Sequence, residues 1–330
     1  MSRPLSRRTF TRLLLGGAAA TMLRPLRAVG GTPAHATAVR HSTYVMGQVA
    51  TITAYGAPEP VLREAITEAF NALRKVDALM SVFSDTSDVG RINGAPAHTP
   101  VAVDPWTVHA LLHAAHYSDV SHGAFDHTVE PLMRVWGFRE KRSSMPSDAE
   151  LAAAYDAVGV DNIRTDPTPG AATVHLRNAR TKIDLGGSAV GCALEHAAAC
   201  LIDRGVTSAL IDVSGDMVAI GAPPDADGWE VGIVDPLHTD SCITKYTIRD
   251  QALATSGNYA SFVEYNAVRF GHIMDPQDGH PAHALASATV IARRGHAADA
   301  LSTAAFIDPS LTIAAGTIIR VRTTGEVVTS

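Results

Sequence analysis

The residues best suited to chemistry lie in a glycine-rich turn, Asp184-Leu-Gly-Gly-Ser-Ala-Val-Gly191. The apolar residues before it predict a short strand, and Cys192 to Arg204 carries apolar positions at helical spacing and ends before Gly205. The two glycines let a ligand approach the backbone, and the free N–H groups of a helix N-terminus suit an anion such as phosphate. The Asp184 carboxylate suggests a metal, or a donor-bearing group such as a base or ribose. The alternative is a purely structural turn between strand and helix.

Four further segments place polar residues at or near the ends of predicted elements. Gly215-Asp216 follows a predicted strand, and Thr255-Ser-Gly-Asn-Tyr259 is a small-residue turn that can expose backbone donors. His272 stands at a strand end, and its ordinary pKa near neutrality suits a general base. Asp299 and Thr303 are four residues apart on a predicted helix, so they share one face and can bind a hard cation such as Mg²⁺. A lone histidine is more often structural, and Asp299 alone also fits a helix cap.

The composition is typical of a globular protein, with 330 residues and 46% hydrophobic content. The formal net charge of −6 conceals an asymmetry, because six arginines and no acidic residues lie before Thr37. Without those six, 21 of the 27 Lys+Arg remain against 33 Asp+Glu, which leaves the body at about −12. This balance argues against nucleic acid or an anionic membrane surface as the partner. A phosphorylated ligand would need local backbone donors or a cation.

The N-terminal segment has the features of a twin-arginine export signal. The motif Ser6-Arg-Arg-Thr-Phe10 is followed by an apolar stretch, Leu13 to Leu23, which is too short to span a bilayer. Ala34-His-Ala36 is a candidate cleavage site, and Ala36-Thr-Ala38 is the alternative. We therefore expect a signal peptide over residues 1–36 and a periplasmic or extracytoplasmic protein without stable membrane insertion. No cysteine follows the apolar stretch closely, so no lipid anchor is expected.

The rest of the chain alternates between helical and strand periodicity. Helices are predicted over residues 60–79, 106–117, 148–155, 192–204 and 296–307. Strands are predicted over residues 45–54, 173–176, 181–184, 209–213, 229–235, 245–249, 252–255, 287–292 and 313–321, with 173–176 and 181–184 as a hairpin. Residues 81–93 are polar and turn-rich. Because no internal repeat or low-complexity linker is visible, one α+β domain over residues 37–330 is expected.

Taken in order, these segments resemble the ApbE family, the FAD:protein FMN transferases. The first matching segments are Met46-Gly-Gln-Val49, Phe83 to Asn93, Gly123-Ala-Phe-Asp126 and Pro131 to Phe138. The match continues through Asp184 to Gly191, Ser214-Gly-Asp216, Thr255 to Tyr259, His272-Ile-Met-Asp-Pro276 and Ala298 to Thr303. One such motif is unspecific, whereas this many in the family's order are specific.

The resemblance implies an ApbE-like, T-fold-related α+β domain with mixed or antiparallel sheets packed by helices. It implies Mg²⁺-dependent cleavage of FAD, in which FMN passes to a threonine hydroxyl of an acceptor protein and AMP leaves. By similarity, His272 and Asp299 are the catalytic residues, with His272 as the base or as the group that positions the phosphate. The metal would be held by Gly187, Asp299, Ser302 and Thr303. The FAD site would be lined by Met46, Phe83, Ala124, Phe125, Asp126, Asp184, Val190, Asp216 and Ile273.

The sequence also departs from the family pattern. The helix that usually begins Ile-Ala-Lys-Gly-Tyr reads Ser188-Ala-Val-Gly-Cys192 here. Val190 removes a positive charge and Cys192 an aromatic ring, so we expect FAD affinity to be affected more than metal binding. Two other functions stay open: hydrolysis of FAD to FMN and AMP by water, and non-catalytic binding of flavin by an exported protein. The Asp299–Thr303 pair favours an enzyme, whereas Val190 favours the binding protein.

Overall fold

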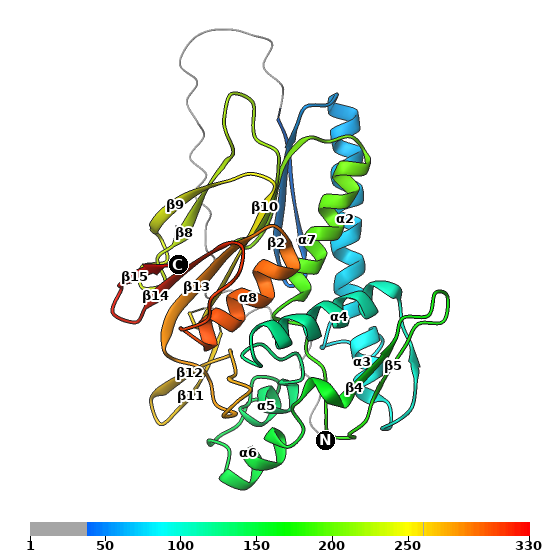
Figure 1. Cartoon of the computed structure of the whole chain (residues 1–330), viewed down its shortest axis with the longest axis vertical. Coiled ribbons are helices and arrows are strands. Elements are labelled where there is room, and N and C mark those ends of the chain that lie inside the picture. The colour runs from blue at the N-terminus through cyan, green and yellow to red at the C-terminus, as the bar shows by residue number, and fades with distance from the viewer. Residues whose placement is uncertain (1–37, 260) are drawn as a thin grey trace.

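The computed structural model describes residues 38–259 and 261–330, so the export signal predicted for residues 1–36 lies outside the described residues. The largest element is an eight-stranded sheet of order β1-β2-β6-β7-β10-β13-β14-β15, in which each neighbouring pair is antiparallel (Figure 1). Its strands are β1 (Val39–Val45), β2 (Gln48–Tyr55), β6 (Ser208–Val213), β7 (Asp216–Ile220), β10 (Gln251–Gly257), β13 (Leu285–Ala292), β14 (Thr317–Arg322) and β15 (Val327–Thr329). The α+β class predicted from the sequence is confirmed.

Helices cover one face of this sheet and a hairpin covers the other (Figure 1). The helices are α2 (Glu59–Met80), α7 (Ala189–Asp203) and α8 (Gly295–Ile307), and the hairpin consists of β8 (Trp229–Val234) and β9 (Cys242–Ile248). Buried residues of the helices form one core with the sheet, and the hairpin residues Trp229 and Ile233 contribute to a second core. Because both faces are covered, β6 is buried at every residue and does not alternate between buried and exposed positions.

A smaller region fills the lower half of Figure 1. It contains β3 (Val101–Ala102), β4 (Ile163–Asp166), β5 (Thr173–Leu176), β11 (Phe262–Tyr265), β12 (Val268–Gly271), α3 (Asp88–Gly94), α4 (Pro105–Val120), α5 (Glu130–Val135), α6 (Asp148–Tyr155) and the 3-10 helix η1 (Val160–Asn162). The strands β3, β5 and β4 form an antiparallel sheet in that order, and β11 pairs with β12. Leu132 and Trp136 pack with Tyr265 and Met274 in a core of their own.

Local sequence signals explain where several helices begin. Helix α4 starts with Pro105 after Asp104, whose carboxylate accepts a hydrogen bond from the N–H of Trp106. Helix α6 starts with a capping box, in which Ser147 and Glu150 bond each other's backbone N–H groups. The structure gives α6 the bounds that the sequence predicted. It extends the other four predicted helices by one to three residues at one or both ends, and α7 ends one residue earlier than predicted.

The predicted hairpin of residues 173–176 and 181–184 is wrong. Residues 173–176 do form β5, but β5 pairs with β3 and β4. Residues 181–184 belong to no strand, because the Asn93 side chain takes the place of a strand partner. Asn93 donates from Nδ2 to the Ile183 carbonyl at 2.8 Å and accepts from the Ile183 N–H at 2.7 Å. A side chain 90 residues away thus satisfies the backbone that a hairpin was expected to satisfy.

Three further sequence assignments need correction. The strand predicted over residues 45–54 is the end of β1 and most of β2, separated by a turn at Met46 and Gly47, both with positive φ. The polar segment 81–93 contains the helix α3, which Ser87 caps by accepting from the Gly90 N–H. The expected turn at residues 255–259 begins only after Gly257, because β10 pairs with β13 up to that residue.

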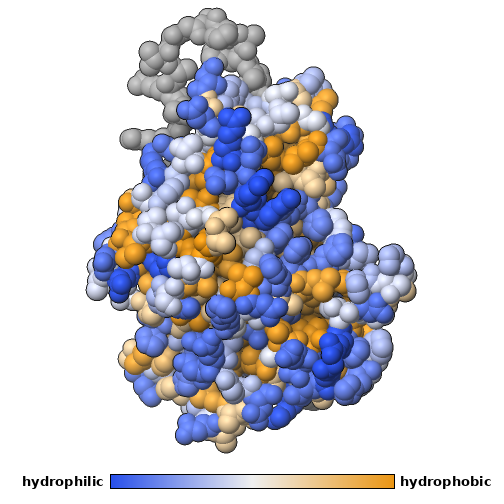
Figure 2. Space-filling view, in the orientation of Figure 1, coloured by the Kyte–Doolittle hydropathy of each residue, from blue (hydrophilic) through white to orange (hydrophobic). Residues whose placement is uncertain are grey.

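The surface and the helices fit a globular protein. Figure 2 shows one face on which hydrophilic residues separate several small hydrophobic groups. Among the residues that the structure describes, no helix combines the length and the apolar character needed to cross a bilayer.

Candidate active site

One end of the central sheet gathers several of the predicted site segments. Val213 pairs with both Ala50 of β2 and Asp216 of β7, so the Met46 turn and Asp216 lie at the same end of the sheet. Strand β10 passes beside them, and the backbone N–H of Thr255 donates to the Asp216 carboxylate at 3.0 Å. Asp216 is therefore held at the sheet end by a neighbouring strand.

Asp299 reaches this end from helix α8 and caps the N-terminus of helix α7. Its Oδ2 accepts from the backbone N–H of Gly191 at 2.7 Å. Gly191 is the third residue of α7, so its N–H has no acceptor within the helix, and the positive end of the helix dipole favours a carboxylate there. The two helices touch closely, because a Cβ added to Gly191 would lie 2.4 Å from the carbonyl oxygen of Gly295. Asp299 is thus a cap, but for a helix other than its own.

Three hydroxyl groups gather one turn further along α8 from Asp299, and Ser302 Oγ donates to the Asp299 backbone carbonyl. Ser256 Oγ, near the end of β10, lies 2.9 Å from Ser302 Oγ and 3.0 Å from Thr303 Oγ1. The glycine turn approaches from the other side, because a Cβ on Gly187 would lie 3.2 Å from Thr303 Oγ1. The structure therefore brings the predicted metal residues Gly187, Asp299, Ser302 and Thr303 together, from a turn and a helix more than 100 residues apart.

The two carboxylates of this cluster are poorly compensated. Burial raises the pKa of Asp299 to about 7, against the opposing hydrogen bond from Gly191. Burial and then the charge of Asp299 raise the pKa of Asp216 well above its usual range, against the bond from Thr255. No lysine or arginine in the described part of the chain acts on either pKa. Carboxylate and hydroxyl oxygens without a cation are the donor set that a hard ion such as Mg²⁺ prefers.

The described residues contain no group of three or more His, Cys, Asp or Glu side chains that could hold a metal by themselves. A cation here would therefore need hydroxyl, backbone, water or ligand oxygens besides Asp299. Mg²⁺ is commonly held in this way, by one or two carboxylates together with substrate phosphates.

Asp184 lies in a different electrostatic setting, next to Arg139, whose side chain is 11% exposed. Arg139 donates through Nη2 to Asp184 and through Nε to Glu130 at 2.7 Å. Its guanidinium carbon also lies 5.0 Å from the ring centroid of Phe83. The other Asp184 oxygen accepts from the Gly186 N–H at 2.8 Å, which shapes the glycine turn. Asp184 is thus already paired with a cation.

His272 directly follows β12 and is close to this pair. Its Nδ1 lies 3.3 Å from the Ser261 carbonyl oxygen, which can only accept, so Nδ1 carries the proton and Nε2 is left as an acceptor. Burial lowers the pKa of His272, while Asp184 acts to raise it and Arg139 to lower it. A neutral imidazole with an unprotonated Nε2 is suited to receive a proton.

The other predicted FAD-site residues are mostly apolar and buried. Phe125 packs against the glycine turn, since its Cε2 would lie 3.3 Å from a Cβ on Gly187. Ala124, Phe125, Val190 and Ile273 are at most 9% exposed. One oxygen of Asp126 accepts from the backbone and the hydroxyl of Thr128, and burial raises the pKa of Asp126. Met46 donates its N–H to Asp77 of α2 at 3.2 Å, which fixes the hairpin turn.

Comparison with known proteins decides the family. The sequence matches the ApbE family over residues 46–315. The chain belongs to the ApbE family. Among curated relatives of this family, the FAD:protein FMN transferase of Haemophilus influenzae is 31% identical over 241 residues, which cover 71% of this chain and 70% of the relative. The FAD:protein FMN transferase of Treponema pallidum is 30% identical over 277 residues, with 80% and 76% covered.

Solved ApbE structures agree with the fold. The ApbE protein of Thermotoga maritima superposes with a TM-score of 0.80 at 28% identity, over 89% of this chain and 97% of that one. The flavinyl transferase ApbE of Pseudomonas stutzeri, in its apo form, gives 0.77 at 27% identity over 89% and 94%. The ApbE resemblance predicted from the sequence is confirmed, and with it the assignment of the chain to a family of enzymes.

Sequence reasoning missed two residues of this candidate site. Arg139 lies between Trp136-Gly-Phe138 and a charged segment, and nothing in that context distinguishes a buried arginine from an exposed one. The sequence pattern places Ser256 only in a small-residue turn. Its place beside Ser302 and Thr303 follows from the packing of α8 against β10, which the sequence does not reveal.

Proposed function

We propose that this ApbE-family enzyme transfers FMN from FAD to a threonine hydroxyl of an acceptor protein and releases AMP, with Mg²⁺ as cofactor. The observation that carries the proposal is the buried Asp299 carboxylate at the N-terminus of α7, which has the Ser302 and Thr303 hydroxyls one turn away and no lysine or arginine of the described residues acting on its pKa. The names of the relatives, FAD:protein FMN transferase, support flavin transfer to a protein.

The requirement for Mg²⁺ follows from the charges at this helix end. The N-terminus of α7 and its glycine turn suit a pyrophosphate, but Asp299 already occupies the Gly191 N–H with a negative charge. Two anions at one helix end repel each other unless a cation lies between them. We assign Asp299, the Thr303 hydroxyl and backbone oxygens of Gly187 and Ser302 to that cation. When bound, Mg²⁺ neutralises charge on the pyrophosphate oxygens.

The FAD itself is assigned to the surface around the glycine turn. Its binding residues would be Met46, Phe83, Ala124, Phe125, Asp126, Asp184, Val190, Asp216 and Ile273. Val190 brings no charge, and the cationic group near this surface is Arg139, which is held by Asp184 and Glu130. Arg139 thus orients Asp184 and Phe83 in the pocket. Most of the negative charge of the phosphates would be neutralised by the metal.

His272 is assigned as the base. In this step Nε2 of His272 takes the proton of the acceptor threonine hydroxyl, and the threonine oxygen attacks the phosphorus atom of the FMN half. The bond from that phosphorus to the bridging oxygen breaks, and the bridging oxygen leaves with AMP. The neutral state and the Ser261-directed tautomer of His272 suit this transfer.

The function is tested by incubating the purified protein with FAD, Mg²⁺ and a candidate acceptor protein. Flavin fluorescence that remains on the denatured acceptor, together with AMP, supports transfer. AMP without covalent flavin would make the protein an FAD hydrolase in the same site. Neither product, with FAD bound, would make it a flavin-binding protein.

We also propose export by the twin-arginine route to a periplasmic or extracytoplasmic location, on the motif around Arg7 and Arg8. Changing both arginines to lysine should leave the protein in the cytoplasm, as measured by fractionation and immunoblotting. Normal export of the double variant would refute the route.

A further inference from the structure

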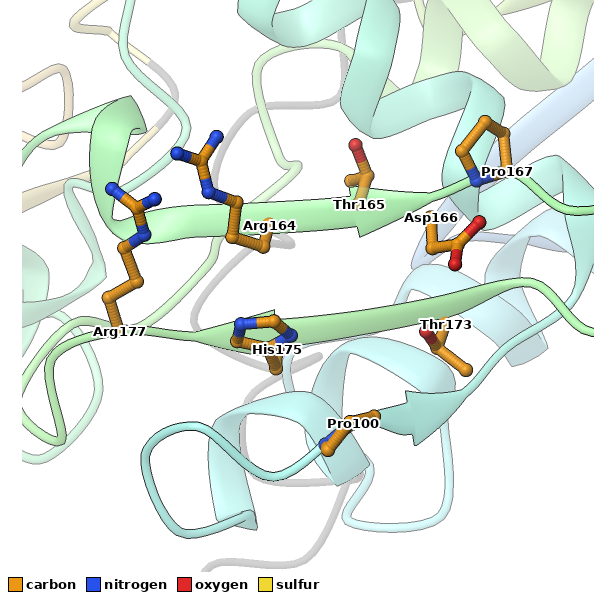
Figure 3. Close-up of a pocket in the computed structure, with 8 residues that line it drawn as sticks. All are labelled: Pro100, Arg164, Thr165, Asp166, Pro167, Thr173, His175 and Arg177. Carbon is orange, nitrogen blue, oxygen red and sulfur yellow. The ribbon is translucent and has the colours of Figure 1, made fainter.

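A second polar surface lies away from Asp299, on the three-stranded sheet of the lower region. Its cavity of about 540 Å³ is lined by Pro100, Arg164, Thr165, Asp166, Pro167, Thr173, His175 and Arg177. Figure 3 shows Arg164 on β4 with His175 and Arg177 from β5 and its end. We call this surface the Arg164–Arg177 patch. The function proposed above does not use it.

The strand register explains why these side chains share one face. Arg164 is the cross-strand partner of His175, and Arg177 is two residues beyond His175 along the chain. Side chains alternate between the two faces of a strand, so the residues between them point inward. Val174 and Leu176 are accordingly buried, at 0% and 3% exposure, and anchor the sheet from below. The patch therefore stands on a sheet whose opposite face is packed in the core.

The two arginines have no partner of their own. Arg164 and Arg177 are exposed, and within residues 38–259 and 261–330 neither guanidinium forms an ion pair or a hydrogen bond. Arg91, Arg139 and Arg204 each pair with a carboxylate. Together on one face of the sheet, these two unpaired guanidinium groups concentrate positive charge in a body that carries about −12, and each offers a fork of donors that fits a carboxylate.

We propose that the Arg164–Arg177 patch docks an acidic, extended segment of the acceptor protein. Arg164 and His175 stand on neighbouring strands, about 5 Å apart, and alternate residues of β5 are about 7 Å apart. The acidic side chains of an extended peptide at alternate positions have the same spacing of about 7 Å. This inference rests on the proposed function, since it supplies the surface by which the enzyme recognises its protein substrate.

The lining favours a peptide over a phosphate or a membrane. Asp166 brings a negative charge and uses only Oδ1 for its bonds to Thr168, which leaves Oδ2 to accept from a peptide N–H. A phosphate, free or in a lipid, has no N–H donor for Asp166, whereas a peptide can pair its carboxylates with the arginines and an N–H with Asp166. An anionic bilayer would also face the negative charge of the rest of the body, whereas a short segment touches only the patch.

The patch is near enough to the candidate active site for one acceptor to reach both. Six residues separate Arg177 from Asp184, so the seven Cα–Cα steps between them span at most about 25 Å even if that chain were fully extended. A protein interface of ordinary size, roughly 800 Å² on each partner, covers a comparable span.

The test uses a fluorescent peptide with glutamate at alternate positions and measures its anisotropy with the full-length protein. The Arg164→Glu/Arg177→Glu variant should bind it at least about tenfold more weakly than wild type, and the wild-type affinity should fall as salt is raised. The matched control is Arg249→Glu/Arg293→Glu, which changes the net charge equally at two exposed arginines elsewhere. The control should bind as wild type does.

Three results would overturn the proposal: equal binding by the patch variant, displacement of the peptide by inorganic phosphate at low millimolar concentration, or preferential binding to vesicles containing anionic phospholipid. Circular dichroism shows whether the variant folds, and Arg164→Gln/Arg177→Gln repeats the test without charge reversal. The assay needs no FAD, Mg²⁺ or turnover, so its failure is distinguishable from failure of the transferase assignment. With a flavinylated acceptor, the patch variant should raise KM for the acceptor and leave kcat unchanged.

Discussion

Two aspartates flank the same glycine turn and helix, and their surroundings differ. Asp184, before the turn, is paired with the guanidinium of Arg139 and with the Gly186 N–H. Asp299, which caps α7 after the turn, accepts from the Gly191 N–H and forms no ion pair within the described part of the chain. The first charge is balanced within the chain, and the second is not. A carboxylate that burial leaves without a cation marks the place where a cation from solution is most useful.

The largest effect is expected at Asp299. Asp299→Ala should abolish turnover and make FAD binding insensitive to Mg²⁺, because the assigned carboxylate ligand is lost. Isothermal titration with FAD, with and without Mg²⁺, measures this. Asp299→Asn keeps an oxygen that can accept from Gly191 and should give the same result with the helix cap retained. Asp184→Asn is the contrasting control and should keep its Mg²⁺ dependence. If the Asp299 variants keep a wild-type Mg²⁺ dependence, the metal lies elsewhere.

The next effect is expected at His272. His272→Ala should slow transfer by roughly 10²–10⁴-fold and leave FAD binding nearly intact, because the base is lost while the pocket remains. Single-turnover rates at saturating acceptor measure it. His280→Ala, at an exposed histidine eight residues further along, should have little effect and serves as the control. An unchanged rate in His272→Ala would rule out the proposed role.

Stability should depend strongly on Arg139. Arg139→Gln leaves Glu130, which is 0% exposed, and Asp184 without their shared cation, and should lower the free energy of unfolding by roughly 3–5 kcal/mol. Arg134 pairs with the same Glu130 at 2.9 Å but is 55% exposed, so Arg134→Gln should cost less than about 1 kcal/mol. Urea unfolding of both variants measures the difference. Equal losses would mean that Arg139 is not the buried counter-charge.

The smallest effect concerns pH. His127, whose carbonyl accepts from the Asp184 N–H, is 2% exposed, and burial lowers its pKa to about 4. Between about pH 6.5 and 4 the unfolded chain binds a proton here that the folded chain does not, so this contribution to stability is lost as pH falls through that window. The loss should be roughly 1–3 kcal/mol. His127→Gln should show a shallower decline in urea unfolding between pH 7 and 4.5, and parallel curves would contradict the assignment.

Helices, which depend on the local sequence pattern, could be predicted from the sequence. Features that depend on contacts between residues far apart in the chain could not. Capping residues such as Asp104 and Ser147 mark helix starts, and the predicted helices are confirmed. Residues 181–184 have strand character, but Asn93 satisfies their backbone, so no pattern within the segment could reveal the outcome. The spacing of Asp299 and Thr303 predicted a shared face. The packing of α8 against α7 lets Asp299 cap α7, and its packing against β10 brings Ser256 to the hydroxyls of α8. Neither contact can be predicted from the spacing.

The contact between α7 and α8 has a consequence for interpreting genetic variation. A Cβ on Gly191 would lie 2.4 Å from the Gly295 carbonyl oxygen, and one on Gly295 would lie 2.6 Å from the Gly191 carbonyl oxygen. Any other amino acid at either position must push the helices apart and draw Asp299 away from the N–H it caps. In a mutational screen, such alleles would score as null beside the catalytic substitutions, although neither glycine has a side chain that could touch a substrate. A ranking of positions by their sensitivity to substitution would therefore place Gly191 and Gly295, which only allow the helices to pack closely, among the catalytic residues.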